Sequence, residues 1–315
     1  MVNILVTGGC GFIASNFINT ISIQYPQYKI INLDKLDYCS NIHNVREGSS
    51  TFIKGDIKNR DLVTFLIKEF DFDVVFHFAA QSHVDNSFSD PVMFTYENVC
   101  GTHNLLEAFR LEKPSVQFIH FSTDEVYGTW VSGPAFTEKD TLVPTNPYAA
   151  SKAAAEMIVQ SYIKSFKMNI KIIRCNNVYG PKQYPEKLIP KFISLLKNDK
   201  KCTLHSNSDI KRAFIHVDDV TSAVMAVYDK GLPGEVYNIS SEYELSVIDI
   251  TKLIIKATKG TDCCEEWIEY IEDRPFNDNR YFINSDKLKN LGWRQEKDIE
   301  YLLQFIKDSS ILLLL

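Results

Sequence analysis

A short acidic run and a distant tyrosine–lysine pair are the residues of this 315-residue chain whose types and spacing could carry out chemistry. The run Thr123-Asp124-Glu125 follows an apolar segment, and Tyr148 and Lys152 lie further along the chain. Four residues apart on a helix, this tyrosine and lysine share one face, so the ammonium is expected to lower the pKa of the phenol toward that of a useful base. Two adjacent carboxylates suit acid–base work, because different environments can hold one protonated and the other ionised.

Each feature also has an ordinary structural interpretation. A tyrosine and a lysine at this spacing are common on amphipathic helices, and a lone Thr or Asp often caps a helix. The reactive interpretation gains weight because the acidic run comes directly after a predicted strand of a parallel sheet, whose carboxyl edge is where ligands bind. A cofactor motif elsewhere in the chain points to the same edge.

A glycine-rich turn follows the first apolar strand. Gly9, Gly11 and Ala14 fit the pattern G-x-G-x-x-G/A, in which glycines allow a tight turn and a close backbone approach to a pyrophosphate at the next helix's N-terminus. Such a segment can also be no more than a turn. We predict cofactor contacts at four of its residues: Gly8, Gly11, Phe12 and Ile13.

Further cofactor contacts are predicted after the next strands. Asp34 ends the second strand, where a carboxylate is expected to bind the adenosine ribose and to repel the 2′-phosphate of NADP. This favours NAD as the cofactor, although Lys35 beside it leaves the selectivity open. Four residues that follow the third and fourth strands lie at the same predicted edge: Asp56, Ile57, Ala79 and Ala80.

The elements that must position these residues alternate between β-rich and helical patterns. Strands are expected near residues 3–7, 29–33, 51–54, 73–78, 116–122, 170–174 and 235–239, and helices near 12–24, 61–70, 91–110 and 146–166. This alternation predicts an α/β fold with a doubly wound, Rossmann-type parallel sheet.

The pattern breaks after Asn177 into a Pro- and Lys-rich sequence, so the later chain is expected to supply a smaller substrate-binding lobe. We predict an NAD-binding domain of residues 1–177 with about 212–238 and 290–305. The nucleotide-sugar-binding lobe would comprise about 178–211, 239–289 and 306–315.

The composition limits the classes of partner. A net charge of -6 and the lack of a Lys/Arg run argue against nucleic-acid binding. The seven cysteines have no paired ligand spacing, which argues against a disulfide framework or a metal site. No apolar stretch reaches the length of a membrane span, and the first strand has no leader pattern before it. We therefore expect a cytoplasmic enzyme without a metal, a nucleic-acid partner or a membrane contact.

Five motifs give the chain a family resemblance over nearly its whole length: residues 8–13, 77–85, 122–128, 146–152 and 177–181. On these residues the chain resembles the extended short-chain dehydrogenases/reductases, and specifically the nucleotide-sugar 4,6-dehydratases. Thr123-Asp124-Glu125 is the specific part, because related epimerases and decarboxylases usually lack it. Residues 33–41, 184–187 and 273–282 look most like the UDP-glucose 4,6-dehydratase domain of plant rhamnose synthases.

The resemblance implies a closed redox cycle that converts UDP-glucose to UDP-4-keto-6-deoxyglucose. Tyr148, assisted by Thr123 and Lys152, would take the 4-hydroxyl proton while a hydride passes to NAD⁺. Glu125 would then remove the C5 proton and Asp124 would protonate the departing C6 hydroxyl, before the hydride returns to C6. The family usually forms homodimers.

Further contacts are expected along the nucleotide sugar and the cofactor. Arg212 and Arg274 are candidates for the diphosphate because a guanidinium fork matches phosphate oxygens, although each could be a surface ion pair. By resemblance, Asn98 would contact the cofactor. The substrate would contact His83, Asn177, Lys187, Leu188 and Asn277.

Three other functions fit the same fold. A dTDP-glucose 4,6-dehydratase would share every motif. An epimerase or decarboxylase acting on a UDP-sugar would share the NAD site, Tyr148 and Lys152 but would need no acid–base pair for C5 and C6. A non-catalytic NAD-binding sensor is the alternative from another class, and the presence of Thr123, Tyr148 and Lys152 argues against it.

Overall fold

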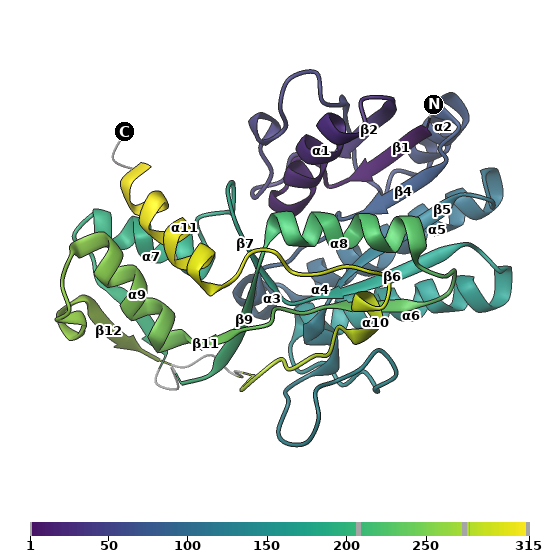
Figure 1. Ribbon diagram of the computed structural model, residues 1–315. Coiled ribbons are helices and arrows are strands. Elements are labelled where there is room, and N and C mark those ends of the chain that lie inside the picture. The colour runs from purple at the N-terminus through teal and green to yellow at the C-terminus, as the bar shows by residue number, and fades with distance from the viewer. Residues whose placement is uncertain (1, 206–208, 273–275, 277, 313–315) are drawn as a thin grey trace.

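A seven-stranded parallel sheet forms the centre of the molecule, in the order β10-β6-β5-β4-β1-β2-β3 (Figure 1). The computed structural model describes residues 2–205, 209–272, 276 and 278–312. The strands of the sheet are β1 (Val2–Thr7), β2 (Tyr28–Asp34), β3 (Thr51–Lys54), β4 (Val74–His77), β5 (Gln117–Thr123), β6 (Ile170–Cys175) and β10 (Val236–Ile239). This strand order confirms the predicted doubly wound, Rossmann-type fold.

Helices cover both faces of this sheet. Because successive side chains of a strand point to opposite faces, Ile4 and Val6 of β1 pack into one hydrophobic core and Leu5 packs into another. The first core is covered by α1 (Phe12–Gln24) and α8 (Val217–Lys230), and the second by α2 (Arg60–Phe70), α5 (Gly101–Glu112) and α6 (Pro147–Phe166).

A second, smaller unit lies beside the sheet and has its own core. Phe192, Ile254 and Leu302 are buried together in that core. Its helices, gathered on one side in Figure 1, are α7 (Leu188–Lys197), α9 (Val247–Lys259) and α11 (Ile299–Leu312). Its strands form a three-stranded and a two-stranded sheet: β7 (Asn177–Tyr179), β9 (Lys211–His216) and β11 (Glu244–Ser246), and β8 (Cys202–His205) and β12 (Ile268–Ile271).

The domain boundaries expected from the sequence stay a proposal. The packing of α11 on α7 and α9 favours drawing the last boundary before Ile299 rather than near residue 305. β9 pairs with β7 and β11, which favours placing residues 211–216 with the smaller unit as well.

One predicted helix differs from the structure. The segment expected as a helix over 91–110 consists of α4 (Pro91–Phe94), a π-helical turn η2 (Thr95–Cys100) and then α5. Such a turn changes which side chains point inward, and it is frequent beside functional sites. The remaining short elements are α3 (Val84–Ser89), α10 (Asp286–Lys289), η1 (Ile42–Asn44), η3 (Asp124–Tyr127) and η4 (Cys264–Trp267).

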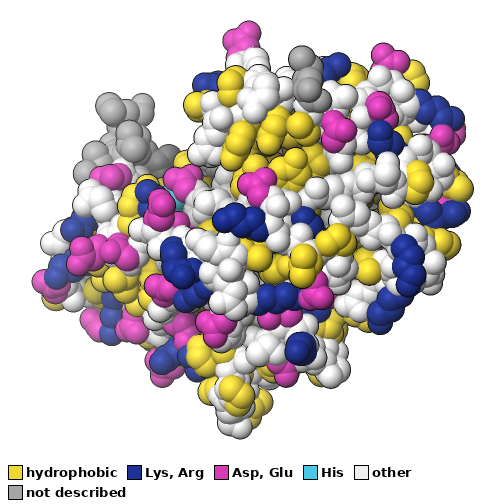
Figure 2. Space-filling view, turned by 45° about the vertical axis from the view of Figure 1, so that its right-hand side comes forward, with side chains coloured by type: hydrophobic (Ala, Val, Ile, Leu, Met, Phe, Trp, Pro, Cys, Tyr) yellow, Lys and Arg dark blue, Asp and Glu magenta, His cyan; other side chains and the backbone are white. Residues whose placement is uncertain are grey.

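The surface carries mixed charge on the face shown in Figure 2, where acidic and basic side chains are interspersed. Within the described ranges, no helix combines the length and the apolar composition needed to cross a membrane.

Candidate active site

One large cavity lies at the carboxyl edge of the central sheet and extends to the smaller unit. Its volume is about 610 Å³, within the range of ligand-binding clefts. Its walls come from the ends of β1 to β6 and from α7, β9 and the segment that includes Tyr281. Residues predicted from distant parts of the sequence therefore meet around one space.

The glycine turn forms one end of the cavity. Gly8 has a φ of +70°, and a Cβ on it would lie 2.7 Å from the Cα of Ala79, so only glycine fits. Gly11 is the N-cap of α1, and its N–H donates to the Gly8 carbonyl at 3.0 Å. Phe12 and Ile13, in the first turn of α1, line the cavity. In the described part of the chain, no side chain caps the N–H groups of this turn.

Carboxylates and small side chains continue this end of the cavity. Asp34, at the end of β2, is buried and accepts N–H groups from Cys10 at 2.9 Å and Leu36 at 2.7 Å. Four more predicted cofactor residues line the same end: Asp56, Ile57, Ala79 and Ala80. A glycine cradle, a helix N-terminus and a carboxylate at the end of β2 together fit a dinucleotide.

Asn98 occupies a different place from the other predicted cofactor residues. It is 1% exposed and is not among the residues that line the cavity. Its side chain accepts from the Gln81 N–H at 2.8 Å and donates to the Gln81 carbonyl at 3.0 Å and to the Ser151 hydroxyl at 2.9 Å. The π-helical turn thus places Asn98 behind the wall, where it supports the segment after β4.

The acidic run forms the opposite end of the site. Thr123 ends β5 and caps η3 by accepting the Glu125 N–H at 3.3 Å, so the strand turns sharply at the cavity edge. The Glu125 carboxylate lines the cavity and accepts from the Asn146 amide at 3.0 Å and the Tyr281 hydroxyl at 3.2 Å. Neither donor is a cation.

Asp124 lies just behind this wall. It is 2% exposed and is not among the lining residues, although Thr123 and Glu125 on either side are. Its carboxylate accepts from the Thr123 hydroxyl at 3.1 Å and from the Asn176 amide at 2.6 Å. The Glu125 carboxylate therefore faces the ligand space, whereas the Asp124 carboxylate does not line it and contacts it only through the Thr123 hydroxyl.

Burial raises the pKa of both carboxyl groups. For Asp124, burial and then the nearby Glu125 raise the pKa to about 7. For Glu125, burial is again the main cause of a raised pKa, with Asp278 also raising it. Carboxyl groups whose pKa values are raised by burial are suited to exchanging protons with a ligand.

Tyr148 and Lys152 lie on one face of α6, as predicted. Asn146 caps this helix by accepting the Ala149 N–H at 2.8 Å, and Pro147 occupies its first position. Both Tyr148 and Lys152 are buried and line the cavity.

The expectation that Lys152 lowers the pKa of Tyr148 is wrong. Burial, followed by the charge of Glu125, raises the pKa of Tyr148 rather than lowering it. The Lys152 ammonium instead donates to the Phe121 carbonyl at 2.7 Å, and burial lowers its own pKa to about 8. Tyr148 is thus a neutral phenol here.

A buried ion pair behind the site joins the helix to the acidic turn. The Arg174 guanidinium pairs with the Glu156 carboxylate of α6 and donates to the Tyr127 hydroxyl of η3 at 2.6 Å. Arg174 and Glu156 are both fully enclosed. The elements that carry Tyr148 and Glu125 are consequently tied to each other through β6.

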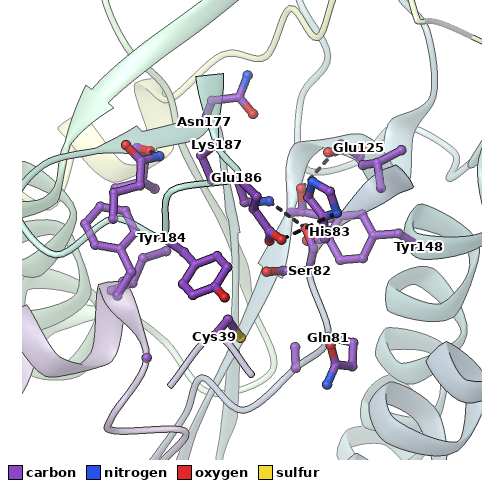
Figure 3. A pocket seen from close by; sticks show the side chains of 18 of the residues that line it. Cys39, Gln81, Ser82, His83, Glu125, Tyr148, Asn177, Tyr184, Glu186 and Lys187 are labelled. Atoms are coloured by element: carbon purple, nitrogen blue, oxygen red, sulfur yellow. Dashed lines mark hydrogen bonds and ion pairs between the residues drawn. The ribbon is translucent and has the colours of Figure 1, made fainter. Parts of the chain in front are cut away.

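Five predicted substrate residues also line the cavity: His83, Asn177, Lys187, Leu188 and Arg212. Figure 3 shows His83 meeting Glu186 across it, with 3.7 Å between the His83 Nδ1 and the Glu186 carboxylate. The Lys187 ammonium donates to the Ser82 carbonyl at 3.0 Å. Arg274 and Asn277 lie outside the described residues.

The Arg212 guanidinium is held by main-chain carbonyls and an aromatic ring, so not all of its N–H groups are free to bind a ligand. Its guanidinium donates to the main-chain carbonyls of Lys211 and Asp278, each at 2.8 Å, and lies 4.8 Å from the centre of the Tyr281 ring. A diphosphate contact would use the remaining donors of the fork.

Three residues of the site were missed by the sequence reasoning. Asn146 and Asn176 hold the two carboxylates; Asn146 is the first residue of the motif that contains Tyr148, and Asn176 directly precedes Asn177. Their place next to a helix start and a strand end was the available signal. Tyr281 contacts Glu125 from 156 residues away, and nothing in the spacing predicts this contact.

Known proteins resemble this chain over most of its length. Human dTDP-D-glucose 4,6-dehydratase is 48% identical over 301 residues, which cover 92% of this chain and 85% of the human protein. A trifunctional Arabidopsis thaliana protein, named in part UDP-glucose 4,6-dehydratase, is 47% identical over 304 residues, 95% of this chain and 46% of the plant protein.

Solved structures of related enzymes are similar to this chain in fold and in sequence. The crystal structure of dTDP-glucose 4,6-dehydratase from Bacillus anthracis in complex with NAD has a TM-score of 0.88 and 39% identity, covering 99% of this chain and 96% of the other. The family described as GDP-mannose 4,6 dehydratase matches residues 5–306. The chain belongs to this family, within the extended short-chain dehydrogenase/reductase fold.

Proposed function

We propose that the protein is an NAD-dependent nucleotide-sugar 4,6-dehydratase, a hydro-lyase of the cytoplasm, and that its substrate is UDP-glucose. The observation that carries this proposal is the meeting of Glu125, Tyr148 and a dinucleotide-type glycine turn around one cavity, with protonatable Asp124 one hydrogen bond away. An epimerase needs a redox site but has no use for the acid–base pair.

The residues that would hold the cofactor are those at the glycine end of the cavity. Gly8 and Gly11 would admit the pyrophosphate, Asp34 would bind the adenosine ribose, and Ala79 and Ala80 would leave room for a flat ring system. When bound, NAD⁺ supplies a hydride acceptor for C4 of the hexose and, once reduced, a hydride donor for C6.

Tyr148 would accept the proton of the 4-hydroxyl. Its phenol must first pass its own proton on, and Lys152 is the adjacent cation that would favour the phenolate once its ammonium leaves the Phe121 carbonyl. Thr123 lines the cavity between this tyrosine and the carboxylates and would bind the same hydroxyl. The product of this step is a 4-ketone, which acidifies the neighbouring C5 proton.

Glu125 and Asp124 would then divide the elimination between them. Glu125 lines the cavity and would take the C5 proton, while Asp124 would release its proton to the departing C6 hydroxyl, so that one water leaves. Asp124 Oδ1 lies 3.1 Å from the Thr123 hydroxyl, and Thr123 lines the cavity. Protonated Asp124 would donate to the Thr123 oxygen while the Thr123 hydroxyl passes its own proton to the departing C6 hydroxyl. Glu125, which gained the C5 proton, then returns this proton to C5.

The nucleotide half would lie between the sheet and the smaller unit. Asn177, Lys187 and Leu188 line that part of the cavity, and Arg212 with Arg274 would bind the diphosphate. His83 and Asn277 would contact the substrate, as the family resemblance implies. Asn98, behind the wall, would support the cofactor through the Gln81 backbone.

The test is parallel incubation with UDP-glucose and dTDP-glucose, with mass detection of a product that has lost one water. dTDP-glucose is the competing substrate because the human relative is named for it. Faster turnover of dTDP-glucose would overturn the UDP assignment, and conversion of UDP-glucose to an isomer of unchanged mass would overturn the dehydratase assignment.

Two variants test the roles of the acidic pair. Glu125→Gln and Asp124→Asn should each slow water loss by about 10²- to 10⁴-fold, the usual contribution of a positioned acid or base. The absorbance of reduced cofactor should still develop, because the first oxidation does not require either group. Equal loss of that absorbance and of product would contradict the assigned roles.

We also propose that the protein is a homodimer. Val92 and Tyr96, on α4 and η2, and Met157, on α6, are large side chains that are about half or more exposed, and these helices contact each other. Light scattering on the purified chain measures the mass directly. A monomer at micromolar concentration would contradict this part of the proposal.

A further inference from the structure

Five charged side chains meet at the cofactor end of the cavity, beside Asp34. They come from the ends of β2 and β3 and from the π-helical turn η2, and they are Lys35, Asp37, Asp56, Lys58 and Glu97. All of them except Lys58 are among the residues that line the cavity. This cluster therefore borders the position that the ribose of a dinucleotide would take.

Glu97 is the member of the cluster that pairs with both lysines. Its two carboxylate oxygens divide between them: Oε2 lies 2.9 Å from the Lys35 ammonium, and Oε1 pairs with Lys58. The Glu97 side chain is 15% exposed, whereas each lysine side chain is about one-third exposed. Glu97 thus pairs with both lysine ammonium groups from the less exposed side of the cluster.

Each lysine also has a second carboxylate partner. Lys35 lies 2.8 Å from Asp37, and Lys58 lies 3.5 Å from Asp56. Although partial burial opposes it, the hydrogen bonds that Lys35 donates to Asp37 and Glu97 raise the pKa of Lys35, so the lysine is a firmly held cation. Both ammonium groups are consequently paired with carboxylates.

A free lysine at this position would change which dinucleotide binds. The carboxylate at the end of β2 bonds the 2′-hydroxyl of NAD, whereas a nearby cation accommodates the 2′-phosphate of NADP. Asp34 and Lys35 are consecutive in the chain, so the sequence contains both signals. The ion pairs determine which signal dominates, because two neighbouring carboxylates offset the positive charge of a lysine and so weaken its attraction for a phosphate.

We propose that Glu97 is a specificity-determining residue that makes the site select NAD over NADP by holding Lys35 and Lys58. With Glu97 in place, the corner has four carboxylates, counting Asp34, against two ammonium groups, and it repels a phosphate dianion. The proposal rests on the proposed function only in requiring that the cavity binds a nicotinamide dinucleotide.

The test measures binding without turnover. Titration calorimetry of the full chain with NAD⁺ and with NADP⁺ gives both dissociation constants for the wild type and for Glu97→Gln. We expect Glu97→Gln to tighten NADP⁺ binding about tenfold, the size expected from one freed charge beside a partly exposed phosphate, while NAD⁺ affinity changes much less. The gain should shrink as salt is raised.

Two further variants make the result specific. Glu112→Gln removes a carboxylate that pairs with Lys68 at the far end of α5, and it should leave both affinities unchanged. Adding Lys35→Met to Glu97→Gln should cancel most of the gain for NADP⁺, since the freed cation is then absent. Circular dichroism on each variant confirms that it is folded.

The outcomes separate this inference from the proposed function. Unchanged NADP⁺ affinity in Glu97→Gln, with normal NAD⁺ binding, would overturn the role of Glu97 and leave the dehydratase proposal intact. Equal weakening of both dinucleotides would also overturn it, because Glu97 would then act only on the shape of the site. A wild-type chain that binds neither dinucleotide would overturn the proposed function itself.

Discussion

The two ends of the cavity hold carboxylates in opposite ways. At the cofactor end, Asp37 and Glu97 pair with lysines, and although burial opposes it, hydrogen bonds from Lys35 and the Tyr38 backbone lower the pKa of Asp37. At the catalytic end, the partners of Asp124 and Glu125 among the described residues are amides and hydroxyls that donate to them, and burial raises their pKa values.

This difference separates a fixed charge from a proton carrier. A carboxylate paired with a cation keeps its charge and can select or repel a ligand, whereas one surrounded by neutral donors in a buried place can gain and lose a proton near neutral pH. Residue type alone does not assign either task, because the neighbours determine it.

The largest effect is expected from removing the phenol at the catalytic end. Tyr148→Phe should lower turnover about a thousandfold, within the range for a positioned acid–base group, without altering NAD⁺ affinity by a similar factor. Tyr162→Phe is the matched control, because Tyr162 lies on the same helix but bonds to Glu107, away from the cavity. Near-normal turnover of Tyr148→Phe would break the comparison.

The next effect concerns the ion pair that ties the catalytic elements together. Arg174→Met leaves the Glu156 carboxylate buried without its partner and should lower the free energy of unfolding by about 3–5 kcal/mol in urea denaturation. Lys68→Met, which breaks the exposed pair with Glu112, should cost less than about 1 kcal/mol. Adding Glu156→Leu to Arg174→Met should recover part of the loss; similar losses for both single variants would contradict this account.

At the cofactor end, Gly8→Ala should weaken NAD⁺ binding by about tenfold or more. The added methyl meets the backbone of Ala79, and the left-handed φ of Gly8 costs an alanine about 1–2 kcal/mol. Calorimetric titration with NAD⁺ measures the effect. Gly48→Ala is the control, since Gly48 also has a positive φ but has no atom within 4 Å of an added Cβ; equal losses of affinity would contradict a local role for Gly8.

The smallest effect is a pH dependence of the elimination step. Because the pKa of Asp124 is raised to about 7, the group holds its proton below this pH and loses it above, so it can protonate the leaving hydroxyl only on the acid side. Water loss at saturating substrate should therefore fall about tenfold between pH 6 and pH 8. Asp124→Asn should lose this dependence at its lower rate, and a retained descending limb would assign the titration to another group.

Local sequence patterns predicted the fold and much of the site. The glycine turn, Asp34 and the Thr123 run each follow a strand, and strands of a doubly wound sheet bring their carboxyl ends together without further information. The Tyr148–Lys152 face followed from helical spacing.

The remainder depends on tertiary packing, which no short pattern contains. Tyr281 reaches Glu125 from a distant segment, and the π-helical turn that turns Asn98 inward lies within an unbroken helical pattern. The expected effect of Lys152 on Tyr148 failed because the burial of both groups, not their spacing, dominates the pKa of the phenol. These effects are set by which atoms surround a group after folding.

The path of the chain between the two cores has a consequence for how this protein can be combined with others. The chain enters the smaller unit after β6, returns to the central sheet for α8 and β10, leaves it again at β11, returns for α10, and enters the smaller unit once more at α11. Neither core is encoded by one continuous stretch, so neither can be transferred, fused or deleted alone. A segment that contains both cores must therefore be moved as one unit. In the trifunctional plant relative, one aligned segment of 304 residues matches 95% of this chain.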